Sequence, residues 1–123
     1  MATTPQSRKA KGRKFQQEIR DIILENFKQL EPDDVRSTPM GVSGPDLMTS
    51  PKSQKVFPFQ PECKCQETTS IFQWMAQAEA NATNKLKAVL FFKRNRSKSY
   101  AVIEASEFIK LMSELNDLRS TKN

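Results

Sequence analysis

Two carboxylates and a lysine are the residues of this chain whose types and spacing could do chemistry. Asp46 follows Pro45 at the end of a glycine-containing loop, and Glu62 and Lys64 are two residues apart in an apolar, β-prone stretch. Carboxylate oxygens are hard ligands that suit Mg²⁺ or Mn²⁺, and an ammonium beside them can orient a water molecule and offset negative charge. We therefore interpret Asp46 and Glu62 as candidate metal ligands, and these two with Lys64 as candidate catalytic residues for phosphodiester hydrolysis.

Other kinds of site are excluded by composition. The chain has no histidine and two cysteines, Cys63 and Cys65, whereas a zinc site needs about four nitrogen or sulfur ligands. The missing histidine also removes Ser-His and Cys-His nucleophile chemistry. Alternation along a strand places the two cysteines on one face, opposite Glu62 and Lys64, and we expect them to be small buried side chains.

The positive charge of the chain favours an anionic partner. There are 20 Lys and Arg against 14 Asp and Glu, a net charge of +6, and the basic residues form two separated clusters. Two such clusters suit a surface that follows phosphates, so nucleic acid is the expected partner. The alternative is a solvated tail and a solvated hairpin tip. The candidate DNA-binding residues in the clusters are Arg8, Lys9, Lys11, Arg13, Lys14, Lys93, Arg94 and Arg96.

The length of 123 residues predicts one domain, and no apolar run approaches the ~18 residues that a membrane span requires. The first residues have no apolar segment after their charges, so we expect no signal peptide, no membrane partner and a cytosolic chain. We expect residues 1–11 to be a disordered basic arm, residues 12–118 to form the domain, and residues 119–123 to be a tail.

Hydrophobic periodicity predicts a mixed α/β fold. An amphipathic helix runs from Phe15 to Leu30, with Gln16 inside the apolar stripe and Glu18 at its edge. A last helix, capped by Ser106, has an apolar side formed by Phe108, Leu111, Met112, Leu115 and Leu118. Between them we expect strands over 33–38, 46–50 and 59–66, a turn at 51–55, a helix capped by Thr69, and a hairpin of 85–93 with 99–105. The order is α-β-β-β-α-β-β-α, a mixed sheet flanked by helices.

The order and the motifs together resemble the PD-(D/E)xK endonucleases, and most closely the archaeal-type Holliday junction resolvases and related phage proteins. The resemblance extends to about residue 112. The matching residues are Lys11 and Gly12 before the first helix, then Arg36, Ser37, Gly41, Ser43, Gly44, Pro45 and Asp46, and finally Glu62 and Lys64.

The resemblance implies a restriction-endonuclease-like core and a Mg²⁺-dependent (or Mn²⁺-dependent) endodeoxyribonuclease that cuts branched DNA in recombination and repair. It adds Arg36, Ser37 and Ser43 to the DNA-binding candidates, and it implies a homodimer in the cytosol of a bacterium or a phage-infected cell. The chain departs from the family at Gln16, where the family has a glutamate. A neutral amide supplies no charge to a metal ion, so Gln16 and Glu18 are the remaining candidate catalytic residues.

Two alternatives remain open. One is a nuclease of the same fold that acts on flaps, forks or ordinary duplex. The other is a DNA-binding protein that has lost catalysis, which Gln16 favours. A dimer interface could use the third-strand region or exposed apolar faces.

Overall fold

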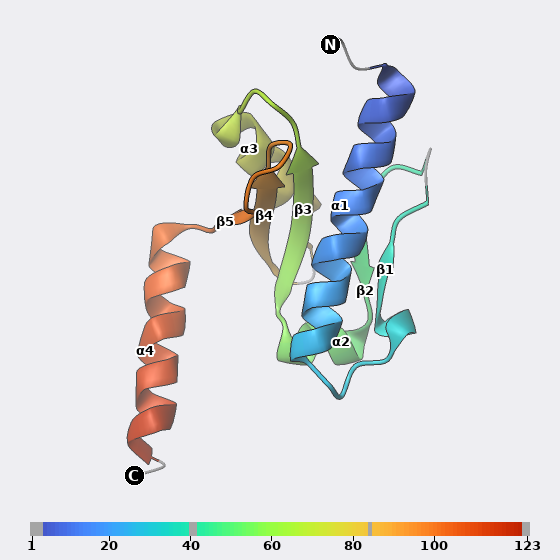
Figure 1. The fold of residues 1–123 in the computed structure, drawn as a ribbon. Helices are drawn as coiled ribbons and strands as arrows, with labels where there is room; N and C mark the ends of the chain where they lie inside the picture. The colour runs from blue at the N-terminus through green and yellow to red at the C-terminus, as the bar shows by residue number, and fades with distance from the viewer. Residues whose placement is uncertain (1–3, 40–41, 84, 122–123) are drawn as a thin grey trace.

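The computed structural model describes residues 4–39, 42–83 and 85–121, which form a mixed α/β fold (Figure 1). The helices are α1 (Pro5–Asn26), α2 (Pro51–Val56), α3 (Ile71–Asn81) and α4 (Ala105–Thr121), with a short 3₁₀ helix at Pro32–Asp34. The strands are β1 (Val35–Ser37), β2 (Leu47–Thr49), β3 (Phe59–Cys65), β4 (Lys87–Lys93) and β5 (Tyr100–Val102). The predicted mixed α/β class is confirmed, but the predicted order of elements is not, because α2 is an element that this order lacks.

Helix α1 begins earlier and ends earlier than the sequence predicts. The Thr4 hydroxyl caps it by accepting the Ser7 N–H at 3.0 Å, and Pro5 occupies the first turn, where its missing N–H costs nothing. Residues 5–11, expected to be a disordered arm, therefore form the first turns of the helix. The helix ends at Asn26 rather than near Leu30.

The buried side of α1 anchors the molecule. Phe15, Ile19 and Ile23 are buried one helical turn apart and pack with Val35 and Leu47 from the β1–β2 pair. Cys63 of β3 completes this core cluster. The position of α1 between β3 and β1 (Figure 1) places its first turns beside the polar end of β3.

The strands form two sheets instead of one. β1 and β2 are an antiparallel pair, and a separate three-stranded sheet has the order β3-β4-β5. In that sheet β3 is parallel to β4, with α3 as the crossover, and β4 is antiparallel to β5. The mixed sheet and the predicted hairpin are confirmed, whereas the expectation that the strands at Asp46 and Glu62 share one sheet is wrong.

Proline at position 61 explains the break between β2 and β3. N–H groups alternate between the two edges of a strand, and the Cys63 N–H points toward the β2 side, where it meets Asp46. Pro61 lies two residues before Cys63, so its backbone nitrogen faces the same edge of β3. Because proline has no N–H, this edge lacks a donor that pairing with β2 would use. Side chains bridge the gap instead: the buried Gln60 amide donates to the Leu47 carbonyl at 2.7 Å.

The segment 51–55 is helical rather than a turn. The Ser50 hydroxyl accepts the Ser53 N–H at 3.0 Å, and Pro51 occupies the first turn, so α2 has a complete start signal. The Asp34 carboxylate accepts the Ser50 hydroxyl at 2.6 Å, which ties the 3₁₀ helix to α2, and this hydrogen bond lowers the pKa of Asp34. This clamp fixes the end of the β1–β2 pair at which Val35 faces Thr49.

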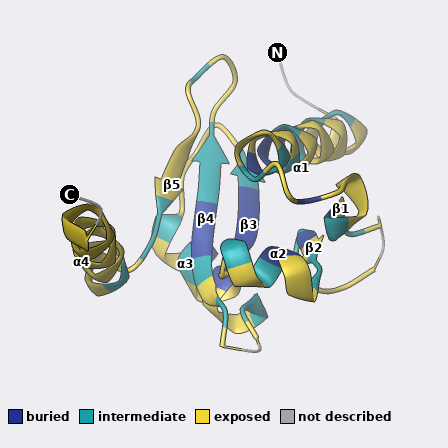
Figure 2. Cartoon of the chain, turned by 90° about the horizontal axis from the view of Figure 1, so that it is seen from below, coloured by how far each residue is buried: buried dark blue, intermediate teal, exposed yellow. Residues whose placement is uncertain are grey.

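Helix α3 packs against the sheet as the sequence predicts, whereas α4 does not. Ser70, not Thr69, precedes α3, and Trp74 and Ala78 are buried against the sheet. Helix α4 begins at Ala105, before the predicted cap Ser106, and it continues through residues 119–121 of the expected tail. It contains no buried residue and stands apart from the sheet that it was expected to cover (Figures 1 and 2). Among the described residues, none of the helices has both the length and the hydrophobicity to cross a membrane.

Candidate metal centre and nucleic-acid interface

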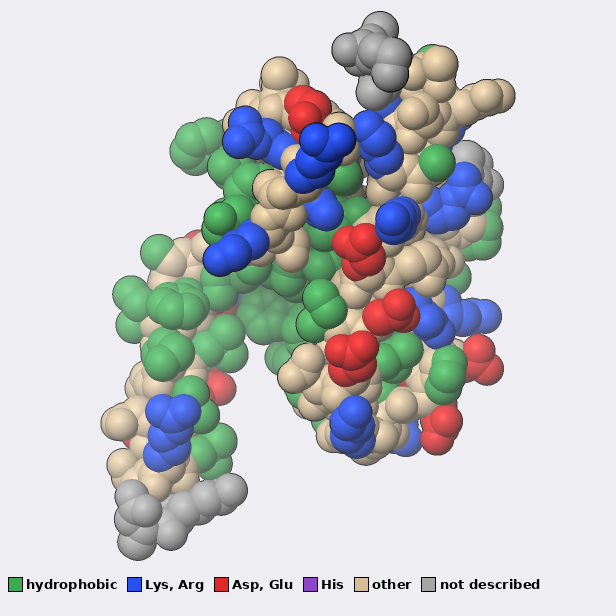
Figure 3. All heavy atoms as spheres, viewed as in Figure 1, with side chains coloured by type: hydrophobic (Ala, Val, Ile, Leu, Met, Phe, Trp, Pro, Cys, Tyr) green, Lys and Arg blue, Asp and Glu red, His purple; other side chains and the backbone are tan. Residues whose placement is uncertain are grey.

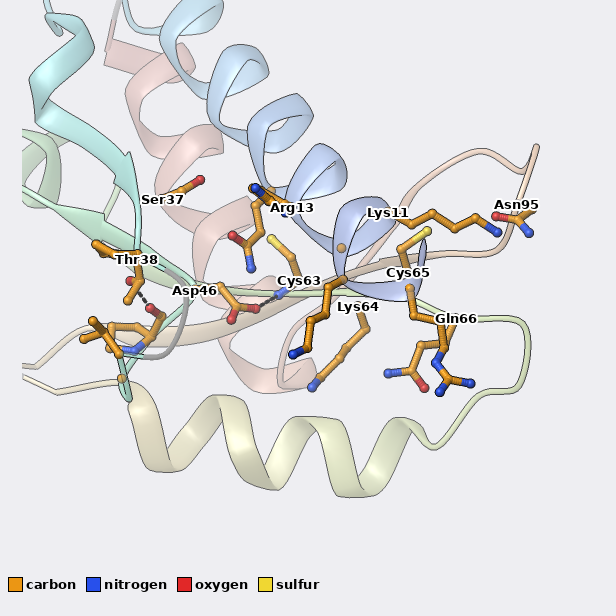
Figure 4. A pocket seen from close by; sticks show the side chains of 18 of the residues that line it. Lys11, Arg13, Ser37, Thr38, Asp46, Cys63, Lys64, Cys65, Gln66 and Asn95 are labelled. Carbon is orange, nitrogen blue, oxygen red and sulfur yellow. Dashed lines mark hydrogen bonds between the residues drawn. The ribbon is translucent and has the colours of Figure 1, made fainter. Parts of the chain in front are cut away.

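The backbone of β3 holds the side chain of Asp46. Its Oδ2 accepts the Cys63 N–H at 2.7 Å, so the carboxylate takes the hydrogen bond that a neighbouring strand would otherwise receive (Figure 4). The loop before it turns at Gly44, whose φ of 131° lies in a region that residues with side chains rarely adopt. The Asp46 carbonyl accepts the Thr38 N–H at 2.9 Å, and the Thr38 hydroxyl donates to the Pro45 carbonyl. Asp46 is therefore held from both sides.

Glu62 is a buried carboxylic acid without hydrogen-bond partners. Its side chain lies at the centre of β3 and is 1% exposed, and neither carboxyl oxygen has a partner among the described residues. Burial and then the negative charge of Asp46 raise the pKa of Glu62 to about 8. Lys64 and Asn81 act in the opposite direction. An unpartnered buried carboxyl group costs free energy, so this position is unfavourable for the fold alone.

The Asp46–Glu62 pair fits a divalent cation. A buried carboxyl group whose pKa is raised by burial and by a neighbouring negative charge, as for Glu62, gains most from a positive charge placed beside it. Mg²⁺ is commonly held by one or two carboxylates, with water and phosphate oxygens completing its shell. Within residues 4–39, 42–83 and 85–121, no three His, Cys, Asp or Glu side chains gather into a fuller metal site. The residues that could hold the ion are thus the two predicted from sequence.

The two faces of β3 have different roles. Cys63 is buried in the core cluster beneath α1 and Cys65 packs against that cluster, on the face opposite Glu62 and Lys64, as alternation predicts. Burial raises the pKa of both thiols, so they remain protonated. Lys64 is half-buried and lines a cleft together with Asp46. The cysteine face therefore makes the apolar contacts that position the strand, although both cysteines also line this cleft.

A cleft of about 1040 Å³ lies between the start of α1, the loop before β2 and the end of β3. Its wall contains Asp46 and Lys64 (Figure 4). Gln16 also lines it, so the position that departs from the family faces the same space as these two predicted residues. Glu62 is 1% exposed and does not line the cleft. The predicted DNA-binding residues in the lining are Arg8, Lys9, Lys11, Arg13 and Ser37. Lys and Arg side chains gather over this end of α1 and the nearby connection of β4 and β5 (Figure 3).

A second cleft of about 620 Å³ adjoins the first, and Lys11 lines both. Its lining includes Lys14, Lys93 and Arg96 from the two basic clusters. Glu18 lies here, away from Asp46, and its Oε2 is 3.9 Å from the Lys93 ammonium. Glu18 therefore pairs with a basic residue and is not brought to the carboxylate pair.

Three predicted DNA-binding residues lie outside both clefts: Arg36, Ser43 and Arg94 are exposed on strand or loop surfaces. Gly41, which contributes to the resemblance, falls outside the described residues. The roles of Arg36, Ser43 and Arg94 in DNA binding stay predictions.

Two features of the site have no clear sequence signal. The Cys63 N–H positions Asp46, but the donor is a backbone group and any residue except proline supplies it. Asn81 on α3 lies close enough to lower the pKa of Glu62 without a hydrogen bond of normal geometry, and this proximity depends on the packing of α3 against β3. Pro61 is the one residue that gives a hint, because a proline inside a β-prone stretch indicates an unpaired edge.

Comparison with known families gives one match, which covers nearly the whole chain. A family model described as "Phage putative PDDEXK endonuclease" matches residues 7–122. No curated protein and no solved structure gave a significant match. The family match confirms the coarser part of the resemblance, a PD-(D/E)xK nuclease with phage relatives.

Proposed function

The chain belongs to the phage PDDEXK endonuclease family, and from this premise we propose that it is a metal-dependent endonuclease that hydrolyses phosphodiester bonds in branched DNA, as Holliday junction resolvases do. The proposed site is the Asp46–Glu62 pair with Lys64, and the proposed cofactor is Mg²⁺ or Mn²⁺. Its place of action is the cytosol of a bacterium or a phage-infected cell.

The observation that carries this proposal is the pair of unpartnered Glu62 oxygens. Both are buried beside Asp46, and the pKa of Glu62 is raised to about 8. A fold gains nothing from an acid in this state, whereas a cation that replaces the proton would satisfy both carboxylates. Perturbed acids of this kind are typical of functional sites.

Each side chain has a distinct proposed role. When bound, the metal ion would polarise the scissile phosphate and lower the pKa of a water molecule. Asp46, fixed by the Cys63 N–H, and Glu62 hold the ion. The Lys64 ammonium lines the same cleft wall, orients the attacking water and offsets the negative charge that develops on the phosphate. Lys11 and Arg13, at the mouth of the cleft, bind flanking phosphates.

The arrangement of positive charge supports a branched substrate. Two adjoining clefts share Lys11, and their basic residues come from α1 and from the segment around Lys93 and Arg96. A linear duplex can be bound along one basic cleft, whereas a branched DNA has several arms, two of which can occupy the two clefts. Two basic clefts of this kind would recognise the shape of the substrate and not its base sequence.

The test is incubation with a labelled four-way junction and a linear duplex of matched sequence, each with Mg²⁺ and with EDTA. We expect metal-dependent paired nicks in the junction and little cutting of the duplex. Equal cutting of both substrates would replace junction resolution with the alternative of a general or flap- and fork-cutting nuclease. No product at any Mg²⁺ or Mn²⁺ concentration would contradict catalysis.

A second candidate function is DNA binding without cleavage, and Gln16 is the observation that favours it. Its neutral amide lines the cleft with Asp46, so among the described residues the carboxylates that could hold the metal ion are Asp46 and Glu62. In that case the junction binds in a salt-sensitive manner and remains uncut. Gln16→Glu, which restores the family's charge, would then be the variant expected to gain metal-dependent products.

A further inference from the structure

Helix α4 has an apolar face that nothing in the described chain covers. A helix with such a face normally buries it, yet α4 contains no buried residue. Hydrophobic side chains run along it, and a hollow separates it from α1 and the sheet (Figure 3). An ion pair ties its first turn to the domain, with the Lys87 ammonium 3.4 Å from Glu107. The exposed fractions are 54% for Phe108, 37% for Leu111, 46% for Met112, 37% for Leu115 and 62% for Leu118.

The spacing of this face is that of a coiled-coil seam. Phe108, Leu111, Leu115 and Leu118 are three, four and three residues apart, which gives a-d-a-d positions of a heptad. We propose that α4 pairs with α4 of a second copy of this chain as a parallel two-stranded coiled coil. A seam of this kind is self-complementary, because the same a and d side chains meet across a two-fold axis.

Charge complementarity supports both the partner and the orientation. With Phe108 at position a, Glu114 falls at g and Arg119 at the following e, and both are exposed. In a parallel pair, g of one helix faces that e of the other, so Glu114 and Arg119 form opposite-charge pairs on both sides of the seam. In an antiparallel pair g faces g, which brings Glu114 against Glu107 and repels. The helix therefore complements a parallel copy of itself.

The association is expected to be weak because α4 has 17 residues, which is less than three heptads. We expect a dissociation constant of roughly 10–100 µM. In sedimentation equilibrium without DNA or metal, the mass should rise from the 14.1 kDa of one chain toward twice that value with concentration. If the mass stays at that of one chain when the protein concentration is about ten times the expected dissociation constant, the proposal is overturned. Because no substrate is present, the result is independent of nuclease activity.

A matched pair of variants tests the seam. Leu115→Asp places a charge at position a in each copy, and we expect the dissociation constant to rise roughly 100-fold because two buried leucines are lost per dimer. Ile109→Asp is the control, since Ile109 is on the same helix and 65% exposed but lies outside the a and d positions. It should leave the dimer intact. Equal loss of dimer in both variants would overturn the assignment of the seam.

Charge exchange tests the orientation. Glu114→Arg places Arg against Arg119 in the parallel pair, so we expect about 3- to 10-fold weaker association at low salt. Adding Arg119→Glu to the same chain should restore association. In the antiparallel arrangement Glu114→Arg would strengthen binding by meeting Glu107, and that outcome overturns the parallel pair.

Discussion

In most proteins charged side chains are exposed and apolar side chains are buried. The site beside α1 and the exposed helix α4 depart from this rule in opposite ways. Next to the cleft residue Asp46, Glu62 buries a carboxyl group that has no hydrogen-bond partner among the described residues. On α4, Leu115 and its apolar neighbours remain in water without cover. The first inversion is relieved by positive charge and the second by apolar surface. The chemistry of each exception thus indicates the kind of partner that would remove it.

The largest expected effect is on catalysis at the cleft. Asp46→Asn keeps an oxygen that can accept the Cys63 N–H, so the fold should persist, but it removes one of two charges from the proposed metal site. We expect cleavage to fall about 10⁴-fold, equivalent to roughly 5 kcal/mol. Single-turnover cleavage under saturating protein measures this loss. Undiminished cleavage would remove Asp46 from the proposed site.

The matched control for this variant is Glu67→Gln. Glu67 is an exposed carboxylate that lines the same cleft and accepts the Asn95 N–H at 2.7 Å. Its replacement changes the net charge by the same amount, so general electrostatic effects of the substitution should be equal. We expect cleavage by this variant to stay close to that of the unmodified protein.

The second effect concerns the stability cost of Glu62. Its pKa is raised from 4.5 to about 8, so between these values the folded protein holds a proton that the unfolded chain has released. The free energy of unfolding therefore falls as pH rises through this window. Glu62→Gln has no such proton, and its stability advantage should grow by on the order of 4 kcal/mol from pH 4 to pH 9.

Urea unfolding at several pH values, without divalent ions, measures this difference between the two proteins. If the free energies of unfolding of the two proteins change with pH in parallel, the pKa of Glu62 is the same in the folded and unfolded chains, and the prediction is contradicted. Adding Mg²⁺ at pH 8 should stabilise the unmodified protein more than Glu62→Gln, because the ion binds the ionised pair.

The third effect contrasts the two long helices. Ile19 on α1 is 4% exposed and belongs to the core cluster, so Ile19→Ala should lower the free energy of unfolding by about 3 kcal/mol. Ile109 on α4 is 65% exposed, and Ile109→Ala should change it by less than about 0.5 kcal/mol. Chemical denaturation measures both. A similar loss in the two variants would show that α4 is packed onto the domain in solution.

The sequence predicted those parts of this comparison that depend on local patterns. The 3.6-residue period located the apolar side of α1, and alternation placed Cys63 opposite Glu62. The start of α1 at Pro5 was not predicted, because residues 1–11 are polar and basic without hydrophobic periodicity, and the start signal of Thr4 and Pro5 was not recognised. In each case the information was local, and at Pro5 it lay in the helix cap and not in the periodicity.

The remaining differences depend on tertiary structure. The separation of β2 from β3 follows from the edge that Pro61 faces, which strand patterns do not specify. The same break frees the Cys63 N–H for Asp46, so the detail that organises the candidate site could not be predicted. For α4, the apolar stripe indicated that the helix would be covered, but an amphipathic pattern does not identify what covers it.

The smallest effect tests whether the clefts bind phosphates. Lys11 lines both clefts, so Lys11→Ala should weaken DNA binding by about 1 kcal/mol and reduce the slope of log affinity against log salt by about 1. Lys28 is the control, because it is an exposed lysine that lines neither cleft and its removal changes the net charge equally. Fluorescence anisotropy across a salt series measures both variants. If Lys28→Ala lowers the slope as much as Lys11→Ala, the effect of Lys11 on DNA binding comes from total charge, and the proposal that the clefts bind phosphates is contradicted. A slope that changes only for Lys11→Ala would instead place a phosphate at the junction of the two clefts, beside the wall that contains Asp46 and Lys64.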